Sequence, residues 1–128
     1  MGDRKKVLVV DDNPAFTQLI QMALSELYEV FTAGDGQQGL DVAQKELPDA
    51  ILLDVMMPNI SGMEMVRLLQ AEPATRNIPI VIVTATRFDN STKDMFKQEP
   101  NVKSFLQKPC GLDDLKQNLE AAFGSTSK

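Results

Sequence analysis

The sequence predicts an α/β fold in which helices cover both faces of a five-stranded parallel sheet. Short apolar runs alternate with amphipathic segments five times along the 128 residues, and no internal linker or low-complexity stretch interrupts them. This alternation is typical of strands joined by right-handed helical crossovers. The length suits one domain, so we expect a single unit over 1–128, with an ordered core over about 5–123 and a frayed tail at 124–128.

The first strand and helix show the pattern clearly. Lys6–Val10 is a continuous apolar run that leads into Asp11-Asp12-Asn13-Pro14, where Asp12 or Asn13 can cap a helix that has proline in its first turn. The apolar residues expected on one face of that helix are Phe16, Leu19, Ile20, Ala23, Leu24 and Leu27. The later strands are expected at 28–33, 50–55, 78–84 and 102–107, and the later helices at 36–47, 62–71, 91–98 and 112–123.

Composition excludes several kinds of function. The chain has no histidine, which excludes a serine triad, a histidine zinc site and an internal phosphohistidine. A single cysteine, Cys110, excludes an internal disulfide, and we interpret it as a tolerated loop residue. The net charge of −5 disfavours nonspecific nucleic-acid binding. Neither a secretory signal nor an apolar run of membrane-spanning length is present, so we expect a cytoplasmic protein without membrane association.

Polar residues that can bind a ligand or take part in a reaction follow the predicted strands. They are Asp11 and Asp12 after the first strand, Asp54 in the third, Thr84 after the fourth and Lys108 after the fifth. Ligands of open parallel sheets bind outside the carboxyl ends of the strands, so these side chains should converge. Singly, each has an ordinary structural role as a cap, a strand residue or a solvated charge. Three clustered carboxylates repel one another unless a cation lies among them, which indicates Mg²⁺ or a similar hard ion.

At these residues the sequence resembles the receiver domain of two-component response regulators, of the stand-alone single-domain type. The resemblance covers nearly the whole chain and is carried by four motifs in order: Val-Val-Asp11-Asp12-Asn-Pro, Leu-Leu-Asp54-Val-Met-Met-Pro58-Asn-Ile-Ser-Gly62, Val-Thr84-Ala85 and Phe105-Leu-Gln-Lys108-Pro109. It implies a flavodoxin-like doubly wound sheet with strand order 2-1-3-4-5.

The resemblance also implies a role for each acidic residue. Asp11 and Asp12 would hold Mg²⁺ together with Asp54 and the main-chain carbonyl of Met56. Asp54 would accept a phosphoryl group from a partner phosphohistidine. The chain would otherwise be no enzyme, since it would catalyse only its own phosphorylation and a slow autodephosphorylation.

Further residues follow from the same resemblance. Lys108, the Thr84 hydroxyl and the main-chain N–H of Ala85 would bind the phosphoryl oxygens. Thr84 and the aromatic Phe105 would form the switch that changes the surface on phosphorylation. The residues expected to shape the surrounding turns are Pro58, Gly62 and Pro109.

Partners follow from that role. The donor would be a histidine kinase or a histidine phosphotransfer protein, and a separate downstream protein would be the target. Homodimerisation is possible, and direct binding to nucleic acid is not expected. A degenerate receiver that acts only as a protein-interaction module is the main alternative.

Two enzyme-like alternatives are weaker. Gly34, Gly36 and Gly39 satisfy the dinucleotide-binding pattern G-x-G-x-x-G, with Asp54 about 20 residues further on. The pattern follows the second strand rather than the first, so we interpret Gly36 as a turn residue and Gly39 as a small helix-to-sheet packing position. A haloacid-dehalogenase-type phosphatase would need a second acid two residues after the nucleophile, where this chain has Met56.

Overall fold

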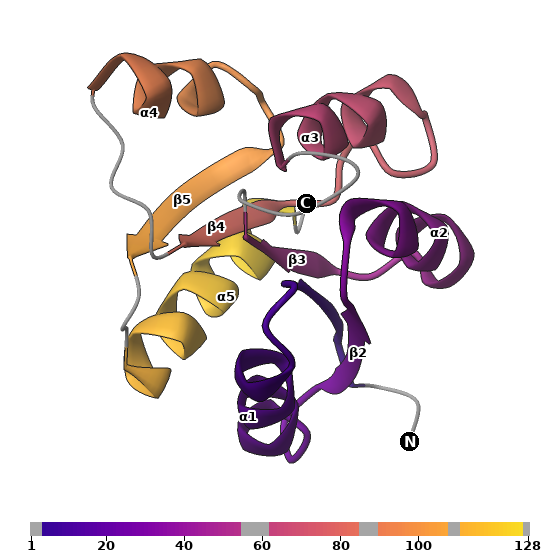
Figure 1. Cartoon of the computed structure of the whole chain (residues 1–128), viewed down its shortest axis with the longest axis vertical. Helices are drawn as coiled ribbons and strands as arrows, with labels where there is room; N and C mark the ends of the chain where they lie inside the picture. The colour runs from indigo at the N-terminus through magenta and orange to yellow at the C-terminus, as the bar shows by residue number, and fades with distance from the viewer. Residues whose placement is uncertain (1–3, 55–61, 85–89, 108–110, 127–128) are drawn as a thin grey trace.

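The computed structural model describes residues 4–54, 62–84, 90–107 and 111–126. Its five parallel strands form one sheet in the order β2-β1-β3-β4-β5, which confirms the predicted fold class and strand order (Figure 1). The elements in chain order are β1 Lys6–Val10, α1 Pro14–Leu24, β2 Glu29–Ala33, α2 Gly36–Glu46, β3 Ala50–Leu53, α3 Gly62–Ala71, β4 Ile80–Thr84, α4 Asn90–Lys97, β5 Val102–Gln107 and α5 Leu112–Thr126.

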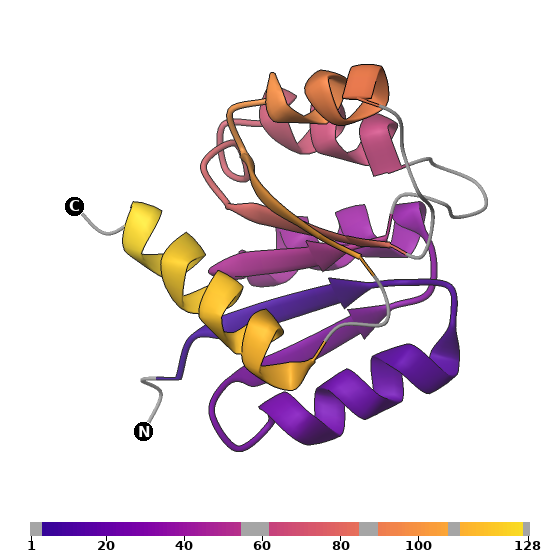
Figure 2. The ribbon, with the colours of Figure 1, turned by 90° about the vertical axis from the view of Figure 1, so that its left-hand side faces the viewer.

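The helices form a layer on each side of the sheet (Figure 2). Helices α1 and α5 pack on one face, and α2, α3 and α4 pack on the other. Successive strand residues serve opposite faces: Leu8 and Val10 belong to the core beneath α2 and α3, whereas Val7 and Val9 belong to the core beneath α1 and α5. Because both faces are buried, the central strands are continuously apolar, as parallel strands usually are.

Helix α1 differs from the expected pattern on its buried face. The residues that it buries are Thr17, Ile20 and Leu24, while Leu19 is 57% exposed, so its predicted burial is wrong. Leu19 lies one residue before Ile20, about a quarter-turn away around the helix, and this offset carries it off the buried stripe. Leu27 was also predicted on this face, but α1 ends at Leu24 and Leu27 is half exposed.

Other element ends differ for local reasons. Strand β4 starts at Ile80 rather than 78 because Pro79 has no N–H to donate to a neighbouring strand. Helix α5 continues to Thr126, three residues past the predicted end at 123. The predicted end of the third strand at Val55 lies outside the described residues, and β3 is seen to Leu53. No helix within the described ranges has the length and apolar character of a membrane span.

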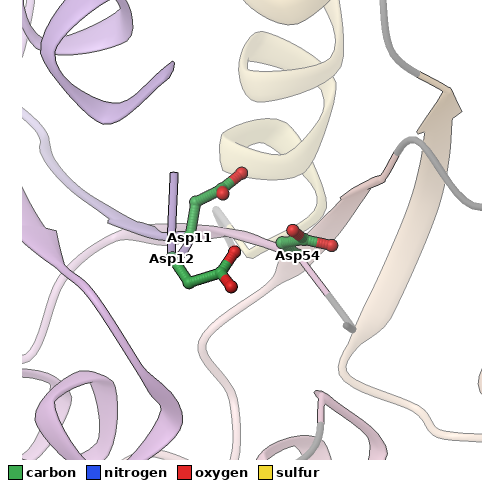
Figure 3. A group of neighbouring side chains, drawn as sticks. All are labelled: Asp11, Asp12 and Asp54. Atoms are coloured by element: carbon green, nitrogen blue, oxygen red, sulfur yellow. The ribbon is translucent and has the colours of Figure 1, made fainter. Parts of the chain in front are cut away.

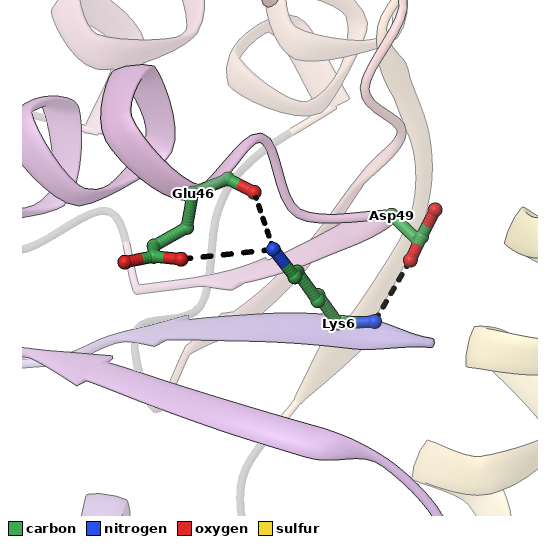
Figure 4. Close-up of polar contacts among 3 residues, drawn as sticks. All are labelled: Lys6, Glu46 and Asp49. Atoms are coloured by element: carbon green, nitrogen blue, oxygen red, sulfur yellow. Dashed lines mark hydrogen bonds and ion pairs between the residues drawn. The ribbon is translucent and has the colours of Figure 1, made fainter. Parts of the chain in front are cut away.

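Polar contacts tie β1 to the α2–β3 connection at the amino edge of the sheet (Figure 4). The Lys6 ammonium lies 3.6 Å from Glu46 Oε1 and donates to the Glu46 carbonyl at 3.2 Å. The main-chain N–H of Lys6 donates to Asp49 Oδ2 at 2.8 Å. Charges of opposite sign thus meet at this edge of the sheet.

Gly39 lies where α2 packs closely against β1 and α3. A Cβ added there would lie 2.8 Å from Met65 Cε and 3.0 Å from both γ-carbons of Val10. This confirms Gly39 as a helix-to-sheet packing position. The interpretation of Gly36 as a turn residue is wrong, because Gly36 is the first residue of α2 and follows the N-cap Asp35.

We expect Gly39→Ala to destabilise the fold by about 1 kcal/mol in urea denaturation. Alanine is favoured over glycine in a helix by about 1 kcal/mol, but overpacking of a core costs about 1–3 kcal/mol. The Met65 methyl can swing away, whereas Val10 is held in a central strand. Gly34→Ala is the control, since its Cβ would meet only Gln38 Oε1 at 3.6 Å. Equal stability of Gly39→Ala and wild type would contradict this account.

Candidate metal centre

Three aspartates meet at the carboxyl edge of the sheet (Figure 3). Asp11 and Asp12 follow β1, and Asp54 follows β3, the neighbouring strand. One carboxylate oxygen from each lies within 4.8 Å of those of the other two. The structure therefore brings together the three carboxylates that the sequence singled out.

Backbone pairing places these residues. The N–H of Asp54 donates to the Val10 carbonyl at 2.9 Å, and the N–H of Asp11 donates to the Ala33 carbonyl at 3.0 Å. Both bonds continue the parallel ladders of β1 by one residue past the strand ends. The positions of Asp11 and Asp54 are thus determined by the sheet itself and not by a loop.

The turn into α1 orients the first aspartate. Asp11 Oδ1 accepts the N–H of Asn13 at 2.9 Å, while the Asn13 side chain accepts from Ala15 and Phe16 and caps α1. Of the two residues considered as the cap, Asn13 is the one that caps the helix. Sequence reasoning missed the second role of this residue as a main-chain donor to Asp11. The signal was the aspartate two residues before it, because an aspartate side chain commonly accepts the main-chain N–H two residues further on.

Burial differs among the three carboxylates. Asp11 and Asp54 are only 2% and 8% exposed, whereas Asp12 is exposed to solvent. Like charges held this close in partly desolvated positions repel one another, and a cation among them removes that cost. The donor set consists of carboxylate oxygens, with no imidazole in the chain, and it fits Mg²⁺ or a similar hard cation.

Thr84 lies at the same edge of the sheet. It is the last residue of β4, which pairs with β3 through Leu53 opposite Ile82, and it is 4% exposed. Its hydroxyl therefore belongs to the strand next to the one that carries Asp54. The sheet order places Thr84 between the acidic cluster and β5.

Phe105 lies on β5, opposite Ile82 of β4. Its ring is half-buried and packs edge-to-face on Phe96 of α4, with 5.8 Å between ring centroids and 80° between planes. The Phe105 ring is thus neither fully exposed nor fully buried.

Of the remaining predicted site residues, only Gly62 lies within the described part of the chain. Gly62 is buried and begins α3. The other predictions fall outside the described residues; they concern Met56, Pro58, Ala85, Lys108, Pro109 and Cys110.

The fold and the site together define the class of the protein: a doubly wound α/β domain with a cluster of three aspartates at the carboxyl edge of its sheet. A sequence profile described as the response regulator receiver domain matches residues 7–120. The chain therefore belongs to the response regulator receiver domain family of two-component systems.

Curated relatives agree with this assignment. Response regulator PleD of Caulobacter vibrioides is 43% identical over 86% of the chain, and Protein PilH of Pseudomonas aeruginosa is 30% identical over 92%. The match spans 97% of PilH but only 24% of PleD and 7% of the Dictyostelium discoideum hybrid signal transduction histidine kinase D. The chain thus spans a quarter or less of the length of several relatives that it matches.

Solved structures show the same fold. Chemotaxis response regulator CheY4 of Vibrio cholerae is 32% identical, with a TM-score of 0.84, and the match covers 93% of this chain and 98% of that one. The receiver domain of sensor histidine kinase PA1611 from Pseudomonas aeruginosa is 29% identical, with a TM-score of 0.83 and coverage of 94% and 98%. That structure has a magnesium ion coordinated in its active-site cleft.

We expect Asp12→Asn to weaken Mg²⁺ binding about tenfold or more, because the site loses one of three anionic ligands. In EDTA the variant should melt at the same temperature as wild type or higher, since one repulsive charge is gone. Calorimetric titration and thermal melts with and without Mg²⁺ measure both effects. Asp41→Asn on α2 removes an exposed charge outside the cluster and serves as the control. Wild-type Mg²⁺ affinity in Asp12→Asn would show that this cluster does not hold the ion.

Proposed function

We propose that the chain is a phosphoryl-accepting switch in which Asp54 takes the phosphoryl group from a phosphohistidine of a partner protein. The observation that carries this proposal is the cluster of Asp11, Asp12 and Asp54, with oxygens within 4.8 Å of one another at the ends of adjacent strands. Family membership supports the same function.

The transfer requires one bond to form and one to break. A carboxylate oxygen of Asp54 attacks phosphorus in line, the P–O bond forms, and the P–N bond to the donor imidazole breaks with its electron pair returning to nitrogen. Asp11 and Asp12, with Asp54 and the carbonyl of Met56, would hold Mg²⁺. When bound, the ion would neutralise charge on the phosphoryl oxygens.

The other binding residues would surround the transferred group. The Thr84 hydroxyl, the Ala85 N–H and the Lys108 ammonium would bind its oxygens, and the position of Thr84 beside β3 supports its part. Pro58, Gly62 and Pro109 would shape the adjoining turns. We assign the chain no catalysis beyond its own phosphorylation and a slow autodephosphorylation.

The partners would be those of a cytoplasmic phosphorelay. A histidine kinase or a histidine phosphotransfer protein would be the donor, because the chain has no histidine of its own. A separate protein would be the downstream target. The hybrid histidine kinase among the relatives supports this kind of donor chemistry.

Asp54→Asn should abolish Mg²⁺-dependent phosphorylation by acetyl phosphate while the fold survives. The amide keeps the shape of the carboxylate but is a very poor nucleophile. Intact-protein mass spectrometry, with Mg²⁺ and with EDTA, measures the gain of one phosphoryl group. Asp41→Asn should label like wild type.

Two results would overturn this assignment in different ways. Labelling of Asp54→Asn at the wild-type rate would show that another residue is the acceptor. A wild-type chain that binds Mg²⁺ but takes no phosphoryl group from acetyl phosphate or from a kinase would be a degenerate receiver, acting by protein contact alone.

Thr84 and Phe105 would transmit the effect of Asp54 phosphorylation to the surface of the domain. If Thr84 moves toward the new phosphoryl oxygens, it vacates space beside β5 into which the Phe105 ring can turn. The partly buried ring between β5 and Phe96 is consistent with such a move, because its present packing is incomplete. A turn of this ring would change the surface between α4 and β5.

Phe105→Trp provides a direct report, because the chain has no other tryptophan. Beryllofluoride with Mg²⁺ stands in for the phosphoryl group, and we expect it to shift the tryptophan emission to shorter wavelength as the ring becomes buried. The same variant carrying Asp54→Asn should show no shift. Binding of beryllofluoride without any change in emission would count against the aromatic switch.

A further inference from the structure

Asn13 takes part in the hydrogen bonding of both the acidic cluster and helix α1. Its main-chain N–H donates to Asp11 Oδ1 at 2.9 Å, and its own side-chain oxygen accepts the N–H of Ala15 at 3.0 Å and that of Phe16 at 3.4 Å. The side chains of Asp11 and Asn13 thus each accept an N–H two residues further along the chain. Two turns of this kind follow one another and lead from the end of β1 into α1.

The bond from Asn13 to Asp11 affects the position of two acids of the cluster. It holds the Asp11 carboxylate directly, and the ring that it closes contains the backbone of Asp12. Asp12 is exposed, so the place of its carboxylate depends more on that backbone than on packing. Asp54 is held separately by the continuation of the β1–β3 ladder (Figure 3). The sheet therefore places Asp54, and the turn at Asn13 orients the other two acids.

The side chain of Asn13 keeps this turn in its conformation. Asn13 has an extended backbone, with φ −93° and ψ 105°, and its carbonyl and its side chain both accept N–H groups of the first turn of α1. An N-cap residue needs such a backbone, and asparagine is among the side chains that favour it most. After Asn13→Ala the side chain would no longer accept these N–H groups, so the first turn would open more often and the N–H of residue 13 would leave Asp11.

A second effect of the same bond opposes cation binding. The N–H of Asn13 offsets part of the negative charge of Asp11 Oδ1 that would otherwise attract a cation. A carboxylate offers about four lone-pair sites, however, so one N–H leaves room for further ligands. Three like charges within 4.8 Å of one another also move apart unless their positions are restricted. The orienting effect should therefore be larger than the effect of the offset charge.

We propose that Asn13 is a positioning residue of the metal centre: by capping α1 it holds its own N–H against Asp11, and it thereby couples cation binding to the first turn of the helix. The coupling is reciprocal, because a cation that favours the held position of Asp11 must favour the capped helix by the same factor. The inference rests on the proposed function only in that the three aspartates bind Mg²⁺, and it does not depend on phosphoryl transfer.

Calorimetric titration with Mg²⁺ tests the effect of the cap on the cluster. We expect Asn13→Ala to bind Mg²⁺ about threefold or more weakly than wild type, since a helix cap is equivalent to about a fivefold change in an equilibrium constant. Asn13→Ser should bind nearly as wild type does, because serine also caps helices. Asn13 is exposed, so its truncation leaves no cavity in the core.

The matched control for stability is Thr75→Val, in the connection between α3 and β4. The Thr75 hydroxyl is buried and donates to the Leu69 carbonyl at 2.7 Å, so its loss should destabilise the fold about as much as the loss of a cap. Urea denaturation compares the stability of the two variants. Thr75→Val should keep the Mg²⁺ affinity of wild type, because it leaves the turn at Asn13 intact.

Amide exchange measured by NMR tests the effect of the cluster on the helix. Mg²⁺ should slow exchange of the Ala15 N–H in wild type but not in Asn13→Ala. The N–H of Gln38 is the control, because the N-cap Asp35 accepts it at 2.8 Å in the first turn of α2, outside the cluster. Mg²⁺ should leave its exchange unchanged.

Four results would overturn the role of Asn13. They are wild-type Mg²⁺ affinity in Asn13→Ala, an equal loss of affinity in Thr75→Val, failure of Asn13→Ser to retain binding, and exchange of the Ala15 N–H that does not respond to Mg²⁺. A wild-type chain that binds no Mg²⁺ would overturn the metal centre itself. The two kinds of failure are therefore distinguishable, and neither measurement requires phosphorylation of Asp54.

Discussion

The acidic cluster depends on the parallel pairing of β1 with β3. The Asp54 N–H extends this pairing past the strand ends by donating to the Val10 carbonyl. Parallel pairing of β1 with β3 brings Asp54 to the same edge as Asp11 and Asp12 despite the distance between them in sequence. The repulsion among the three carboxylates is opposed by the burial of both strands, whose side chains are at most 1% exposed from Val7 to Val10 and from Ala50 to Leu53. The apolar sheet thus stabilises an arrangement that its charges alone would disfavour.

Opposite charges are distributed unevenly over this fold. At the amino edge, Lys6 meets Glu46 and the N–H of Lys6 meets Asp49, so that edge is internally compensated. At the carboxyl edge, the three aspartates of the cluster lie together. The contacts of Lys6 and the candidate metal centre therefore lie at opposite edges of the same sheet.

Sequence reasoning was most accurate where the pattern has only one structural solution. The bounds of β1, α3 and β5 were predicted correctly because a short apolar run or a periodic stretch ends there in a polar or turn residue. The convergence of the three aspartates also followed, because the carboxyl ends of parallel strands share one edge. Their roles in metal binding and phosphoryl transfer remain predictions, as do those of Met56, Ala85 and Lys108.

The misses have physical causes as well. Periodicity places a residue on a helix only to within about a quarter-turn, which is why Leu19 was assigned to the wrong face. Small polar residues such as Gly124, Ser125 and Thr126 do not stop a helix that is already packed over its preceding turns, so the end of α5 was placed too early. The bond from Asn13 to Asp11 needs the actual turn geometry, because either Asp12 or Asn13 could have capped α1.

The sheet order has a consequence for biosynthesis. Strand β1 is made first and lies between β2 and β3, so both of its neighbours and all three aspartates of the cluster are contained in the first 54 residues. That part of the chain cannot bury both faces of the central strands by itself, because the core beneath α1 also contains Leu115 and Leu119 of α5. Since a domain generally folds as a unit, we expect the three aspartates to be held together only after α5 has been synthesised. Their mutual repulsion is then opposed by the complete apolar core.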